Sequence, residues 1–155
     1  MGYSGKHRIK GIKRHFVIDA NGNPLNFSIS KASPHDQTRL LETIDGIRIG
    51  KRKRKLKRLG LDKGYDSDPL RQEVRKRRTI PVAPYRSNRI LQRKPGRPPK
   101  DKHEKRYCRQ RWKAERTFSW TNNNRRLDRM LEKTQKSYRA FIRVYFIKHY
   151  LKLLY

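Results

Sequence analysis

The chain has 155 residues, a length that suits one domain with a buried core and is short for an enzyme of several domains. Its 43 lysines and arginines outnumber the acidic residues, of which there are 13, and the formal net charge is +30. This excess predicts a polyanionic partner, and nucleic acid is the natural one because basic side chains that neutralise phosphates release counterions.

Several classes of protein are not expected from this sequence. It has no long uncharged apolar run that could span a membrane, and residues 1–14 lack the apolar run of a secretory signal. Cys108 is the only cysteine, which excludes a disulfide within the chain and a Cys-based zinc cluster. A cytoplasmic location is therefore expected.

A β-hairpin is predicted near the amino terminus. His15–Asp19 is rich in strand-forming residues, Ala20–Pro24 is a strong turn signal, and Leu25–Ser30 alternates apolar and polar side chains. Ser33 or Asp36 is then expected to cap a helix that ends near Gly46. Its apolar residues repeat at helical spacing: Leu40, Leu41 and Ile44.

The middle of the chain predicts a strand, a helix and a second strand. Gly50–Arg58 is mostly basic, either a solvated loop or a phosphate-contacting strip, and leads into a short strand, Leu59–Asp62. Pro69–Arg78 has proline at a helix start, and Ile80–Ala83 is typical of an edge strand. This order favours a mixed α/β sheet.

Residues 88–102 contain too much proline and glycine for regular structure and are interpreted as a basic linker. Helices are expected from Asp101 onward. The last is predicted to be amphipathic on its apolar spacing, with Tyr138, Phe141, Ile142, Tyr145, Phe146 and His149 on one face.

Two carboxylates have spacing and surroundings that suggest chemistry. Asp62 follows a short apolar strand, where a metal could be held, although capping a turn or pairing with a lysine is the simpler interpretation. Arg111 and Glu115 are four residues apart on one predicted helical face, which alone would indicate only a surface ion pair.

The segments Leu61–Ser67, Arg111–Trp120 and Asn124–Leu127 together resemble bacterial insertion-sequence transposases of the Asp-Asp-Glu type. The likeness continues through Gly11–His15, Gly22–Leu25 and Pro34–Asp36, so it covers nearly the whole chain.

The resemblance implies a ribonuclease-H-like catalytic domain, with Asp62 as the second catalytic Asp and Glu115 as the catalytic Glu. Both would bind Mg²⁺ or Mn²⁺, since hard cations prefer oxygen ligands and two ions about 3.5 to 4 Å apart flank the reacting phosphate in such sites. In the family the first catalytic Asp lies on a strand upstream of Gly11–His15. Residues 1–155 are therefore expected to form a partial domain, an incomplete mixed sheet with carboxy-terminal helices.

Two positions depart from the family pattern. The family's Tyr usually stands three residues before its Arg, whereas Tyr107 stands four before Arg111, and Asn122 replaces a Lys or Arg. Asp19 precedes the Asn21–Gly22 turn, so a turn-forming role is favoured over a substitute for the first Asp.

Basic residues on both flanks of the two carboxylates and in the linker are the candidate DNA contacts: Arg52, Lys53, Arg54, Lys55, Arg97, Arg111, Arg125 and Arg126. Gly96–Pro98 resembles the core of an AT-hook, the alternative being a plain basic linker. Aromatic residues could stack on an unpaired base, but a core position is favoured for Trp112, while Trp120 stays open. His35 lies near the site or simply starts a helix.

The resemblance predicts metal-dependent cleavage and strand transfer at insertion-sequence ends. The expected partners are transposon-end and target DNA, further copies of the chain in the active assembly, and an upstream half supplied by frameshifting, without which little activity and poor solubility are expected. The alternative is a non-catalytic nucleic-acid-binding protein, of ribosomal type or a decayed transposase fragment.

Overall fold

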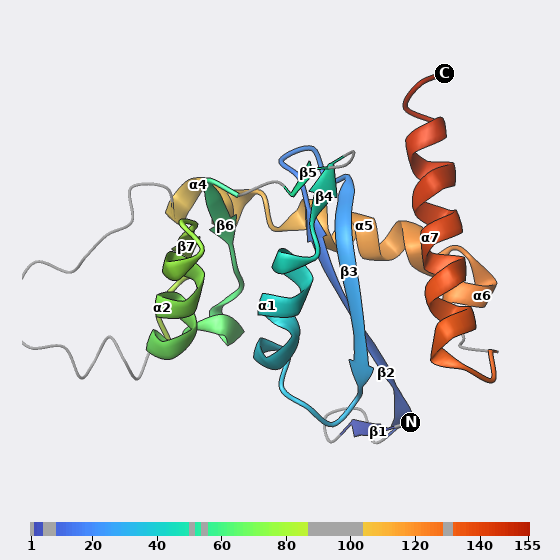
Figure 1. Cartoon of the computed structure of the whole chain (residues 1–155), viewed down its shortest axis with the longest axis horizontal. Helices are drawn as coiled ribbons and strands as arrows, with labels where there is room; N and C mark the ends of the chain where they lie inside the picture. The colour runs from blue at the N-terminus through green and yellow to red at the C-terminus, as the bar shows by residue number, and fades with distance from the viewer. Residues whose placement is uncertain (1, 5–8, 50–51, 54–55, 87–103, 129–131) are drawn as a thin grey trace, which may run out of the picture.

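The computed structural model describes residues 2–4, 9–49, 52–53, 56–86, 104–128 and 132–155 (Figure 1). These ranges contain three small sheets and a set of helices, so the α/β class is confirmed. The proposed linker, residues 88–102, lies outside the described residues.

The predicted hairpin is present and is longer than the sequence pattern indicated. β2 (Ile9–Ile18) pairs antiparallel with β3 (Pro24–Lys31), and Phe16 lies opposite Phe27. β1 (Gly2–Ser4) pairs with the first residues of β2, and Gly2 lies opposite Gly11. The hairpin lies between the helix that follows it and the last two helices of the chain (Figure 1).

The turn of the hairpin is organised by Asp19, as the sequence predicted. One carboxylate oxygen of Asp19 accepts hydrogen bonds from the backbone N–H groups of Asn21 and Asn23, both at 2.8 Å. Gly22 adopts a φ of +93°, a conformation that side chains with a Cβ disfavour.

The helix expected after Pro34 is α1 (Gln37–Asp45), with Gly46 at its carboxy-terminal end. Its buried face packs on the hairpin, where the hydroxyls of Thr43 and Ser28 lie 2.6 Å apart. Asp36 stands at the helix start but makes no capping hydrogen bond with its side chain. Instead its carboxylate pairs with Lys13 at 3.1 Å, which ties α1 to β2.

A strand–helix–strand unit follows, as predicted. β6 (Arg58–Gly60) pairs parallel with β7 (Ile80–Val82), and the connection contains the 3-10 turn η1 (Lys63–Tyr65) and α2 (Asp68–Lys76). Before it, β4 (Arg48–Ile49) pairs with β5 (Arg52–Lys53). Neither short strand was predicted, and β5 lies within the basic run Gly50–Arg58.

The incomplete ribonuclease-H-like sheet implied by the resemblance stays a prediction, because no one sheet joins all the strands in the part of the chain that the structure describes. There the strands form three separate sheets, and the pair β6–β7 shares no ladder with the hairpin. The physical reason is that no described strand lies between β2 and β6 to join them. What connects the two units is an apolar cluster of Val17, Leu40, Ile44, Ile47, Leu59, Leu70 and Val74.

The carboxy-terminal helices are α4 (Glu104–Arg109), α5 (Trp112–Asn122), α6 (Arg125–Asp128) and α7 (Gln135–Leu151). α6 and α7 lie on the side of the hairpin away from α1, whereas α4 lies beside β6, and α5 runs between α4 and α6 (Figure 1). Ile29 of β3 joins Leu127, Tyr138 and Ile142 in a second buried cluster. Within the described ranges, no helix is both long and apolar enough to cross a bilayer.

Candidate active site

Asp62 lies two residues beyond β6 and starts the 3-10 turn η1. Its Oδ1 atom accepts a hydrogen bond of 2.8 Å from the backbone N–H of Lys63. The turn-capping role weighed from the sequence is therefore present. The cap uses one carboxylate oxygen, and 59% of the side-chain surface stays exposed and available to a ligand.

Glu115 lies in the first turn of α5. Its side chain is 66% exposed, and its carboxylate is 3.5 Å from the Nε atom of Arg111. The ion pair expected from the i, i+4 spacing is therefore confirmed.

Arg111 also reaches Asp62, and this second contact was not expected from the sequence. Its Nη1 atom lies 3.6 Å from the Oδ1 atom of Asp62. One guanidinium is thus shared by two carboxylates that come from distant parts of the chain. Because both carboxylates are negatively charged and contact the same guanidinium, the position between Asp62 and Glu115 attracts a cation.

The turn that carries Asp62 is held by a buried ion pair that the sequence analysis did not single out. Asp66 and Arg71 are 5% and 6% exposed, and Arg71 donates to the Oδ1 atom of Asp66 from Nε at 3.2 Å and from Nη2 at 3.0 Å. The other carboxylate oxygen of Asp66 accepts from the backbone N–H of Arg86 at 2.8 Å. The available signal was a second Asp, four residues after Asp62, in a chain with few acids.

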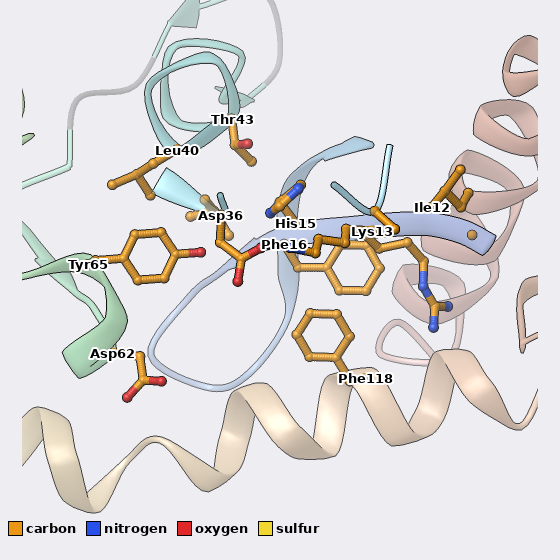
Figure 2. A pocket seen from close by; sticks show the side chains of 14 residues that line it. Ile12, Lys13, His15, Phe16, Asp36, Leu40, Thr43, Asp62, Tyr65 and Phe118 are labelled. Atoms are coloured by element: carbon orange, nitrogen blue, oxygen red, sulfur yellow. Dashed lines mark ion pairs between the residues drawn. The ribbon is translucent and has the colours of Figure 1, made fainter. Parts of the chain in front are cut away.

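A groove of about 630 Å³ runs along β2 beside Asp62 (Figure 2). Residues 11–17 of β2 form one side, Asp62 and Tyr65 lie across from it, and Leu40 of α1 and Phe118 of α5 close it from either side. Phe118 stacks on Phe16 with ring centres 4.8 Å apart, which fixes α5 against the hairpin.

Tyr65 lines this groove, and the pKa of its hydroxyl is shifted strongly. Burial, together with the negative charges of Asp36 and Asp62, raises the pKa of the Tyr65 hydroxyl to about 12. The raised pKa keeps the Tyr65 hydroxyl protonated far above neutral pH, so that it can donate a hydrogen bond into the groove.

The other basic residues predicted to contact DNA lie in β5, in α6 or outside the described residues. Arg52 and Lys53 lie in β5, while Arg54, Lys55 and Arg97 are outside the described residues. Arg125 and Arg126 lie in α6, where Arg126 pairs with Glu132 at 3.6 Å and covers the ring of Phe141. Arg126 is thus partly engaged in packing.

The two positions that depart from the family motif have structural contacts. Tyr107 packs so closely on Gly60 of β6 that a Cβ on Gly60 would lie 2.5 Å from the Tyr107 ring. Asn122 accepts a hydrogen bond of 2.5 Å from Arg14. His35 is exposed just before α1, and its carbonyl accepts a hydrogen bond of 2.8 Å from the Thr38 hydroxyl, which fits a helix start.

The expectation that Trp112 belongs to the core is wrong, because its side chain is 51% exposed at the start of α5. Trp120 is half-buried, and its ring centre lies 5.3 Å from that of His149. The position of Trp112 follows from the docking of α5, whose buried face carries Thr117 and Thr121 instead.

Among the described residues, no group of three or more His, Cys, Asp or Glu side chains could hold a metal ion. Asp62 and Glu115 supply oxygen ligands of the kind that Mg²⁺ prefers, but two carboxylates are fewer than a firmly held pair of ions requires. The donor type therefore fits Mg²⁺ or Mn²⁺, and the donor number is incomplete.

The model of the family "Transposase DDE domain" matches residues 1–148. The chain belongs to this family. It is also 33% identical over 139 residues to a protein of Burkholderia cepacia described as "Putative transposase for insertion sequence element IS402". The alignment covers 86% of this chain and 60% of that relative, so the chain spans less than two thirds of the relative's length. No solved structure matches.

Proposed function

We propose that this chain is the carboxy-terminal part of the catalytic domain of a DNA transposase. Water attacks a phosphodiester at the end of the insertion sequence and releases a 3′ hydroxyl and a 5′ phosphate. The freed 3′ hydroxyl then attacks a phosphodiester of target DNA in line, and the 3′ oxygen of the target strand leaves as a hydroxyl. The observation that carries the proposal is the sharing of the Arg111 guanidinium by Asp62 and Glu115, at 3.6 Å and 3.5 Å, in a member of the transposase family.

Asp62 and Glu115 would hold the metal ions, Mg²⁺ or Mn²⁺. When bound, such ions activate the attacking oxygen and stabilise the leaving oxygen. The residues of this chain do the positioning: the Asp66–Arg71 pair holds the turn of Asp62, and the contact of Phe118 with Phe16 holds the helix of Glu115. Arg111 offsets part of the negative charge of the two carboxylates and is exposed enough to contact a phosphate.

We infer that the groove beside Asp62 receives a strand from an upstream segment of polypeptide. β3 pairs with β2 on one edge, while within the described ranges the other edge of β2 is paired only at Ile9–Gly11. Residues 11–17 of this strand line the groove, and a strand edge that is not paired readily accepts another strand.

A strand in the groove would lie between β2 and the turn that follows β6. It would thereby join the separate small sheets into the single mixed sheet of a ribonuclease-H-like fold. It is also where a third carboxylate could approach Asp62. This placement supports the inference that the chain has little activity without the upstream segment.

The alternative is a basic nucleic-acid-binding protein without catalysis. The net charge of +30 fits both functions. The shared contact of Asp62 and Glu115 with one cation favours the enzyme, because a binder of phosphates gains nothing from two exposed carboxylates at its surface.

The test is magnesium-dependent cleavage of the insertion sequence's own ends after the upstream coding segment is joined to this chain. We expect cleavage by the joined protein and a loss of at least about 100-fold in Asp62→Asn and in Glu115→Gln, which is typical of removing a group that stabilises the transition state. Asp128→Asn, an exposed acid on α6, is the matched control and should keep activity. Activity that survives both site substitutions would overturn the assignment.

A further inference from the structure

Trp112 presents an aromatic ring to solvent within one turn of Glu115. Its side chain is 51% exposed. Apart from Ile80, the other large apolar side chains that are exposed in the described residues lie on α7 or after it. Trp112 is therefore an isolated exposed aromatic next to the candidate active site, and exposure of so large an apolar surface costs free energy unless a ligand covers it.

The ring is held in place by a column of stacked side chains along α5. The guanidinium carbon of Arg116 lies 4.7 Å from the ring centre of Trp112 and 4.7 Å from that of Trp120. Positions 112, 116 and 120 follow the i, i+4 spacing of a helix, so they project from the same face. His149 of α7 extends the column beyond Trp120.

Arg116 is itself anchored, so the column is rigid. Its Nη2 atom donates a hydrogen bond of 2.8 Å to the carbonyl of Asn21 in the hairpin turn. The neighbouring Thr117 hydroxyl donates to the carbonyl of Gly22 at 2.7 Å. A ring backed by an anchored cation loses little freedom when a ligand stacks on it, which favours binding.

The geometry points to a stacking site on Trp112 for an unpaired base at the end of the DNA substrate. A nucleobase is a flat π surface that stacks on an indole, and its phosphates would meet the exposed Arg111 next to Trp112. Glu115 lies three residues further along α5, so a base on Trp112 would be adjacent to the reacting phosphodiester. The stacking site rests on the proposed function, because it would hold one base of the same DNA end that the candidate active site cleaves.

The two tryptophans of the chain make the site directly observable. In Trp120→Phe the indole emission comes only from Trp112, and in Trp112→Phe only from Trp120. We expect single-stranded oligothymidylate to quench the emission of the wild type and of Trp120→Phe, and to leave Trp112→Phe largely unchanged. Unchanged emission of Trp120→Phe at saturating oligonucleotide would overturn the proposal.

Affinity provides the second measurement. Trp112→Ala should bind the oligonucleotide about 5- to 150-fold more weakly, which corresponds to about 1–3 kcal/mol for one base stacked on an aromatic ring. Trp112→Phe keeps an aromatic ring and should recover most of this loss. Binding to a blunt duplex should change less than about 2-fold in every variant, since its bases are already stacked.

Tyr155→Ala is the matched control, because Tyr155 is a fully exposed aromatic beyond α7. It should bind both DNA forms as the wild type does. An equal loss for Trp112→Ala on single strands and on blunt duplex would indicate a general effect and would refute the stacking site. These measurements use binding without metal, so failure of the cleavage test and failure of the stacking site are distinguishable.

Discussion

Arg71 forms two hydrogen bonds with Asp66 inside the molecule, and the pair connects the turn of Asp62 with the chain that leaves β7. Arg71 Nη2 also donates to the carbonyl of Ala83 at 2.7 Å, and its guanidinium covers the ring of Tyr85. Arg71 therefore joins the turn after β6 to the chain after β7, and the position of Asp62 in that turn depends on this arginine.

We expect Arg71→Ala to lower the free energy of unfolding by about 3–5 kcal/mol, because it leaves the buried carboxylate of Asp66 uncompensated. Urea unfolding measures this loss. Arg75→Ala removes an exposed arginine from the same helix and should stay within about 0.5 kcal/mol of the wild type. The double variant Asp66→Leu/Arg71→Met should lose less than the sum of its single substitutions. Additive losses would contradict an energetic coupling between Asp66 and Arg71.

Arg111 should compete with a metal ion for the two site carboxylates. We expect Arg111→Gln to tighten Mn²⁺ binding about 2- to 5-fold, a modest effect because all three side chains are exposed. Electron paramagnetic resonance of free Mn²⁺ during a titration measures the affinity. Arg109→Gln removes the same charge from an exposed position that does not contact the two carboxylates, and it should change the Mn²⁺ affinity less. Equal effects of the two substitutions would show that only the net charge matters.

Acid should destabilise the fold through two histidines. Burial lowers the pKa of His15 and of His149 below the ordinary value of about 6.5. At a pH between the folded and the unfolded pKa values, the unfolded chain binds more protons than the folded chain. The contributions of the two histidines to the free energy of unfolding are therefore complete above about pH 6.5 and are lost as the pH falls.

The urea midpoint of unfolding should therefore decrease from pH 7 to pH 5. His15→Gln and His149→Gln should each flatten this decrease. His35→Gln replaces an exposed histidine and should leave the slope as in the wild type. A midpoint that stays constant over this interval would contradict the role of burial.

Hydrogen exchange should report whether the groove is filled. About half of the backbone N–H groups of residues 12–18 face the free edge of β2, because neighbouring residues of a strand point to alternate sides. We expect these amides to exchange at least about 10-fold more slowly after the upstream segment is joined. Amides of β3 that already pair with β2 serve as the internal reference. Equal exchange with and without the upstream segment would exclude strand pairing in the groove.

Local sequence patterns predicted those elements whose signals are local. The alternation in Leu25–Ser30, the apolar spacing of Leu40 and Ile44, and the proline at the start of α2 each indicate an element without knowledge of the rest of the chain. β4 and β5 were not predicted, since each is two residues long and lies in or beside a basic run without alternation.

The candidate site could be predicted only in part. Asp62 and Glu115 came from the resemblance to the family, while their common contact with Arg111 depends on how α5 packs against the rest of the molecule. The Asp66–Arg71 pair was missed because its partners are five residues apart, a spacing that no regular helix brings together. The exposure of Trp112 was missed because composition does not indicate which face of α5 is buried.

The hairpin turn at 20–24 has a consequence for the order of folding. Thr117 of α5 binds the carbonyl of Gly22 across 95 residues, and Tyr150 of α7 binds that of Pro24 across 126. Loops of this length close slowly relative to local helices and hairpins. Glu115 should therefore reach its native position late, when β2, β3 and α1 have already formed, and catalytic competence would be acquired in one of the last kinetic steps.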